Sequence, residues 1–162
     1  MSPLFLGGID GMNTTSITLD DVVTRAGSAA PAFETMWQAL WSQRRVPPAL
    51  LELCRLRLAQ LHGATAELAV AHPAVQVPPA RRDSVIRGRF AADGQFAPGE
   101  VAVLSLAEVY AQDPAAITDE MADAVRLTYG DAGLVVLIEA LGFIDGRIRM
   151  ARLTNALARV GA

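Results

Sequence analysis

The stretch from Pro48 to His62 constrains the fold most, because it has the pattern of one amphipathic helix between two strong boundaries. Pro47-Pro48 suit a helix N-terminus, and Gly63 permits a turn after the last helical residue. Apolar side chains recur at helical spacing, at Leu50, Leu53, Cys54, Leu58 and Leu61. Because such a stripe has to be buried against other helices, the sequence predicts a helical core around this segment.

The rest of the chain continues this helical pattern, and no segment of the sequence shows sustained strand alternation between turn signals. The other expected helices cover about residues 18–27, 31–45, 65–72, 81–89, 98–111, 118–129 and 132–160. Thr118 is expected to cap its helix, and Gly142 and Gly146 are expected to kink or divide the last one. The sequence therefore predicts one all-α helical bundle over residues 18–162, after a flexible N-terminal arm over residues 1–17.

Composition narrows the class of partner. The 162 residues fit one domain with a real core, and the formal net charge of −3 gives no broad attraction for nucleic acid. The hydrophobic content of 52% is high and the charged content of 19% is low, which favours a homo-oligomer that buries apolar surface. The apolar run 134–143 is too short to cross a bilayer, and the N-terminus lacks a signal-peptide pattern. We expect a cytoplasmic protein without a membrane or nucleic-acid partner.

Two residue counts exclude several kinds of chemistry. Cys54 is the one cysteine, so the chain has no intrachain disulfide, no cysteine-based zinc cluster and no two-thiol peroxidase cycle. Its place within the apolar stripe is typical of a buried structural cysteine. All 14 basic residues are arginine, which excludes a Schiff-base lysine and a P-loop lysine.

Residues 52–63, E-L-C-R-L-R-L-A-Q-L-H-G, resemble the E-L-V-R-L-R-x-A-Q-x-N-G run of the carboxymuconolactone decarboxylase and alkylhydroperoxidase-D-like family. In that family the glycine precedes C-x-x-C and then a histidine. Here the two cysteine positions hold Ala64 and Glu67, and the histidine position holds Ala71, one residue before His72. Glu52 matches the family acid. Weaker similarity, such as A-P-G-E at 97–100 and I-T-D-E at 117–120, extends the resemblance to about residues 37–158.

The resemblance implies an all-α bundle that assembles into dimers, trimers or hexamers, with a site where the thiol pair has been lost. Three functions stay open. One is a non-redox enzyme that acts on a small carbonyl compound, lactone or carboxylic acid by proton transfer, as a decarboxylase, lyase or isomerase would. The second is a non-catalytic ligand-binding or scaffold relative. The third, a residual thiol peroxidase that uses Cys54, is the weakest.

The candidate catalytic residues are Glu52, Glu67 and His62. Glu52 is expected to act as general acid or base, or else to pair with Arg55 at i,i+3. Glu67 either points into the former thiol pocket beside Glu52 or turns to solvent. His62 either moves protons or stabilises a helix C-terminus.

The candidate substrate-binding residues are His72, Trp41 and Arg55. His72, like His62, either moves protons or stabilises a helix C-terminus. Trp37 and Trp41 lie on one helical face, where they either roof a ligand pocket or pack in a core or subunit interface. The glutamate and histidine spacing matches no metal motif, so no metal and no cofactor are expected.

Overall fold

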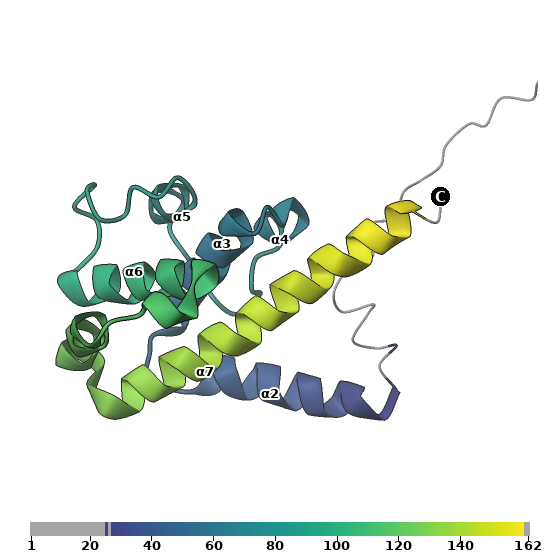
Figure 1. Ribbon diagram of the computed structural model, residues 1–162, viewed down its shortest axis with the longest axis horizontal. Helices are drawn as coiled ribbons and strands as arrows, with labels where there is room; N and C mark the ends of the chain where they lie inside the picture. Colours follow the sequence, from purple (N-terminus) through teal and green to yellow (C-terminus); the bar gives the residue numbers. More distant parts are fainter. Residues whose placement is uncertain (1–24, 26, 161–162) are drawn as a thin grey trace, which may run out of the picture.

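The computed structural model describes residue 25 and residues 27–160, with side chains through residue 155. In this part of the chain the protein is all-helical, with six α-helices and no strand (Figure 1). The predicted helix at 18–27 and the arm at 1–17 lie outside the described residues, apart from Arg25 and Gly27. The elements are η1 (Gly27–Ala29), α2 (Ala30–Ser42), α3 (Pro48–Leu61), α4 (Thr65–Ala69), α5 (Pro79–Ile86), α6 (Pro98–Gln112), η2 (Pro114–Ala116) and α7 (Asp119–Val160).

Helix α3 is the centre of the molecule. It packs against α4, α5, α6 and α7, and nine of its 14 residues are buried. The predicted stripe is wider than expected, because Leu51 and Leu56 are also fully buried. Because α3 has neighbours on several sides, most of its side chains are removed from water, and this burial contributes to hydrophobic stabilisation of the core.

Helix α7 crosses the whole molecule (Figure 1) and bends sharply at Gly130, where φ is 69° and ψ is 178°. Glycine adopts this backbone without steric cost, so the bend falls where the sequence predicted one helix to end. Thr118 caps as predicted, since its hydroxyl accepts the N–H of Met121 at 3.4 Å. The predicted kink at Gly142 and Gly146 is wrong: both lie in continuous helix, and Gly142 leaves room for the Tyr110 hydroxyl instead.

Helix α7 also corrects the prediction that no segment is long and apolar enough to cross a bilayer. By length and composition, residues 119–155 contain a window of mean hydropathy 1.6 that passes this test. The core helix of a compact domain passes it as well, and α7 buries Leu137, Leu141 and Ile144 against its neighbours. Because 33% of that window is buried, packing within the described fold explains part of the apolar sequence of α7 and leaves the rest of it unexplained.

Helices α2 and α4 end earlier than predicted because side chains capture their next residues. After Ser42, the Gln43 side chain accepts the N–H groups of Arg45 and Val46 at 2.7 and 3.0 Å, which turns the chain. After Ala69, Arg55 donates to the Val70 carbonyl and the backbone becomes extended. Helix α5 begins two residues before the predicted start of 81 and ends at Ile86 rather than 89. α2 and α4 lie on opposite sides of the C-terminal half of α7 (Figure 1).

Candidate functional site

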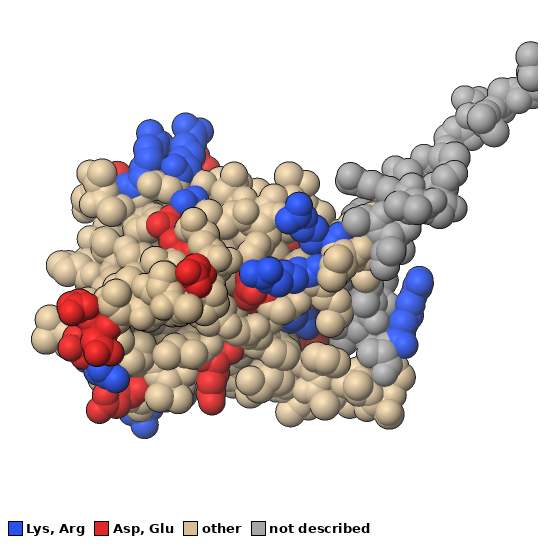
Figure 2. Space-filling model, in the orientation of Figure 1, with Lys and Arg blue, Asp and Glu red and all other residues tan. Residues whose placement is uncertain are grey.

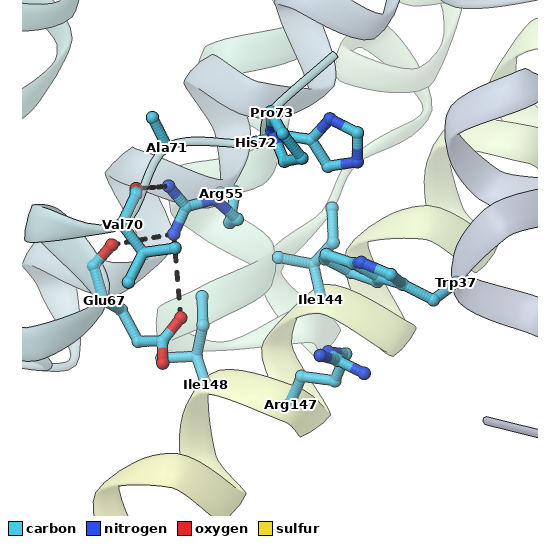
Figure 3. Close-up of a pocket in the computed structure, with 10 residues that line it drawn as sticks. All are labelled: Trp37, Arg55, Glu67, Val70, Ala71, His72, Pro73, Ile144, Arg147 and Ile148. Atoms are coloured by element: carbon cyan, nitrogen blue, oxygen red, sulfur yellow. Dashed lines mark hydrogen bonds and ion pairs between the residues drawn. The ribbon is translucent and has the colours of Figure 1, made fainter. Parts of the chain in front are cut away.

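A pocket of about 210 Å³ lies between α2, α3, the α4 segment and α7. An engineered apolar cavity of about 150 Å³ is large enough to hold benzene, so this pocket has room for a small organic molecule. Its walls are partly apolar and partly charged (Figure 3). The lining residues are Trp37, Arg55, Glu67, Val70, Ala71, His72, Pro73, Ile144, Arg147 and Ile148.

Arg55 and Glu52 form a buried, bidentate ion pair next to the pocket. Arg55 Nε and Nη2 each donate to a Glu52 carboxylate oxygen at 2.7 Å, and the two residues are 4% and 2% exposed. The remaining donors of Arg55 reach the carbonyls of Glu67 at 2.8 Å and Val70 at 2.6 Å. Arg55 thus lines the pocket, whereas Glu52 lies behind it and holds the guanidinium plane in place.

Glu67, at the second cysteine position of the resembling motif, lines the pocket from α4. Its carboxylate oxygen Oε2 lies 3.7 Å from Arg55 Nη1, so the charges attract without a close hydrogen bond. Figure 3 shows this side chain turned toward Arg55 and Ile148 rather than away from the cavity. Glu52 and Glu67 therefore meet through Arg55, on opposite sides of one guanidinium group.

His72 lines the pocket at its aromatic end. Its ring stacks on Trp41 with centroids 4.3 Å apart, and Trp41 in turn packs edge-on against Trp37 at 5.1 Å. Burial lowers the pKa of His72 below its ordinary value; nearby Arg55 acts in the same direction and Glu52 against it. His72 is therefore a neutral imidazole at neutral pH, able to accept or donate a proton. Trp41 does not line the pocket but supports the ring that does.

The α7 wall was not foreseen in the sequence. Arg147 places its guanidinium 4.2 Å from the centre of the Trp37 ring, a cation–π contact, and Ile144 and Ile148 flank it. Their i, i+3, i+4 spacing puts these three residues on one helical face, which was a usable signal. The sequence alone does not show that this face of α7 lies beside α2 and α4.

His62 lies outside the pocket and belongs to a second polar cluster. Its Nε2 atom pairs with Asp145 Oδ1 of α7, and Asp145 Oδ2 accepts from Arg149 Nε at 2.6 Å. Arg149 also donates to the Ala111 carbonyl at 3.3 Å. This geometry ties α3, α6 and α7 together. His62, one of the two partners that the sequence suggested for Glu52, therefore lies outside the pocket that Arg55 and Glu67 line.

Cys54 is fully buried in α3, and burial raises the pKa of its thiol to about 12. A thiol with this pKa is almost entirely protonated at neutral pH and is a poor nucleophile. In the described part of the chain, no group of three or more His, Cys, Asp or Glu side chains is arranged to hold a metal ion. Cys54 therefore contributes no reactive group to the pocket.

Four arginines lie on or just after α5, where Figure 2 shows a group of basic side chains, and two of them bind other groups of the fold. Arg81 binds Glu100 at 2.7 Å and lies over the Phe96 ring, and Arg82 donates to the Leu68 carbonyl. Arg87 and Arg89 are exposed. Arg81 and Arg82 are therefore engaged within the fold, whereas Arg87 and Arg89 are turned to the surface.

Comparisons with family models, with curated proteins and with solved structures found no match to this chain.

Proposed function

We propose that this protein binds a small organic molecule in the pocket and acts on it by proton transfer, without thiol chemistry. One observation carries the proposal: the Glu67 carboxylate, the His72 imidazole and the guanidinium groups of Arg55 and Arg147 line the same small pocket. Groups of this kind supply general acid–base catalysis when they face a bound substrate within hydrogen-bond reach.

The chemistry that fits these groups is removal of a proton from a carbon next to a carbonyl group. Glu67 takes the proton, and the electron pair moves onto the carbonyl oxygen to give an enolate. A guanidinium beside that oxygen stabilises the developing negative charge. The neutral imidazole of His72 accepts this proton from Glu67 and returns it to the enolate, which gives an isomer and leaves both groups as they began. Alternatively, the enolate expels a leaving group, which takes the proton, and the protein then acts as a lyase.

Glu52 has a different role in this proposal from the one that its sequence position favoured. Because both of its carboxylate oxygens accept from Arg55, Glu52 is a positioning residue that orients the guanidinium. In this proposal, Glu67 and His72 carry the general acid–base roles, whereas the sequence suggested Glu52 and His62 for them.

We also propose that the chain is a distant relative of the carboxymuconolactone decarboxylase and alkylhydroperoxidase-D-like family. The support is the pattern at 52–63 together with the position of the pocket, which is lined by Glu67, the residue at the second cysteine position. Ala64 is buried at the start of α4, and Glu67 lines the cavity.

Proton exchange in heavy water tests the proposed chemistry before the substrate is known. Wild type is incubated with small 2-keto acids, 3-keto acids and lactones, and NMR follows the loss of the proton next to the carbonyl. We expect Glu67→Gln to lower the rate by about 10²–10⁴, the usual contribution of a general base. Glu139→Gln is the matched control, because Glu139 is exposed on α7 outside the pocket. Equal rates for wild type and Glu67→Gln would contradict the assignment.

A non-catalytic binding protein is the second candidate. It is favoured by the hydrogen bonding of Arg55, because four of its five N–H donors are already taken by Glu52 and two carbonyls. Calorimetry with the same compounds separates the two functions. Binding that depends on Arg147, with no exchange or turnover of the bound compound, would favour this candidate.

We further propose that the protein is a homo-oligomer. The support is the high hydrophobic content of 52% together with exposed apolar side chains on α7, where Leu127, Val135 and Ile138 are 90%, 56% and 44% exposed. Light scattering at micromolar concentration should give a multiple of 17.2 kDa, and a monomer would contradict the proposal.

A further inference from the structure

One segment builds half of the pocket wall. Residues 67–73 supply five of its ten lining residues, namely Glu67, Val70, Ala71, His72 and Pro73. The same segment contributes little to the core: α4 has no buried residue, Leu68 packs against the core only partly buried, and Val70 is 54% exposed. A segment with so few buried apolar contacts opens at a much lower free energy than the core helices do.

Arginine side chains from two other helices fasten this segment. Arg55 of α3 donates to the carbonyls of Glu67 and Val70, and Arg82 of α5 donates to the carbonyl of Leu68. Glu52 takes Nε and one hydrogen of Nη2, which fixes the plane of Arg55 and aims its remaining hydrogens at those two carbonyls. The acceptors are backbone oxygens, so these contacts hold the path of the chain rather than a particular side chain.

The segment also has a place to pivot. Gly63, with φ at 62°, joins α3 to α4, and a Cβ built there meets no atom within 4 Å. At the other end, the Val75 N–H donates to the His72 carbonyl at 3.1 Å in a turn that includes Pro73. A glycine in open space can absorb the change in backbone angles that an opening motion needs.

We propose that residues 65–73 form a lid over the pocket and that the Glu52–Arg55 ion pair is its latch. The lid opens about Gly63 to admit and release the ligand, and it carries Glu67 and His72 into place when it closes. The inference rests on the pocket being the functional site, but the motion itself is measurable without any ligand.

Amide hydrogen exchange tests the lid on the full chain. The double variant Glu52→Leu with Arg55→Met removes the latch without leaving a buried charge, a replacement that folded proteins often tolerate. Arg82→Gln removes the separate bond to Leu68, and Arg126→Gln is the matched control, since Arg126 pairs with Asp123 and Asp131 away from the pocket. We expect the amides of residues 65–72 to exchange about tenfold faster or more in the double variant, with a smaller increase in Arg82→Gln. The amides of α6 should keep their rates.

Acrylamide quenching of fluorescence gives a second measure, because the two tryptophans of the chain both lie at the lid. Quenching should rise in the double variant and, to a smaller extent, in Arg82→Gln, and it should stay unchanged in Arg126→Gln. If α6 and residues 65–72 exchange at equal rates in wild type, the segment is not a separate unit and the lid is wrong. If the double variant does not fold, unchanged exchange in Arg82→Gln alone overturns the proposal. A moving lid with no proton exchange on any compound would instead count against the proposed function.

Discussion

Two clusters of paired polar and charged side chains meet α3 in different surroundings. The Glu52–Arg55 cluster borders an open pocket and adds Glu67 across the guanidinium. The His62–Asp145–Arg149 cluster lies between packed helices, and its acid and histidine line no part of the pocket. Both contain residue types that acid–base enzymes use. The difference teaches that residue type alone does not make a site, since a reacting group also needs an adjoining space for a substrate.

The largest expected effects separate the two clusters by activity. Glu67→Gln should lower proton exchange by about 10²–10⁴ while changing stability little, because Glu67 is only partly buried. His62→Gln should do the opposite: it leaves the Asp145 carboxylate with one partner fewer and costs about 1–3 kcal/mol of unfolding free energy. Exchange assays and urea unfolding of both variants check this pair. A large loss of activity in a folded His62→Gln protein would return His62 to the site.

The next effect compares the arginine of each cluster. Arg55→Ala should destabilise the fold by about 3–5 kcal/mol, because it leaves the Glu52 carboxylate buried without its partner. Arg149→Ala should cost about 1 kcal/mol or less, because the Arg149 side chain is 54% exposed and water screens its pair with Asp145. The measurement is the urea midpoint at constant m-value. Equal losses would mean that the two clusters do not differ in burial as described.

Local patterns predicted the fold well because helix signals are local. Pro48, Gly63 and Gly130 set boundaries that depend on backbone chemistry, and the structure confirms each of them. The boundaries that moved were set by distant side chains. The α4 helix ends at Ala69 where Arg55, 15 residues before Val70, captures the Val70 carbonyl.

The candidate site was harder to predict for the same reason. The pair of Glu52 with Arg55 is an i,i+3 contact that spacing alone permits, and it was one of the two expected readings. The partner of His62 is 83 positions away in Asp145, and Arg147 reaches the pocket only through the packing of α7. No local pattern contains such contacts, because they arise from the crossing of helices.

The smallest effect concerns the two histidines and pH. Burial places the pKa of His72 below its ordinary 6.5, so the unfolded chain binds more protons than the folded one in the range between the two values. The neutral form of His72 therefore adds stability above pH 6.5, and this contribution is lost as the pH falls through the folded-state pKa. An NMR titration of the His72 ring, recorded in the His62→Gln background to remove overlap, should show a midpoint below 6.5. Trp41→Leu should move that midpoint upward, because water then reaches the face of the imidazole that the indole covers. A midpoint at or above 6.5 in the protein with Trp41 intact would show that His72 is not desolvated, and it would weaken the case for a neutral imidazole in the pocket.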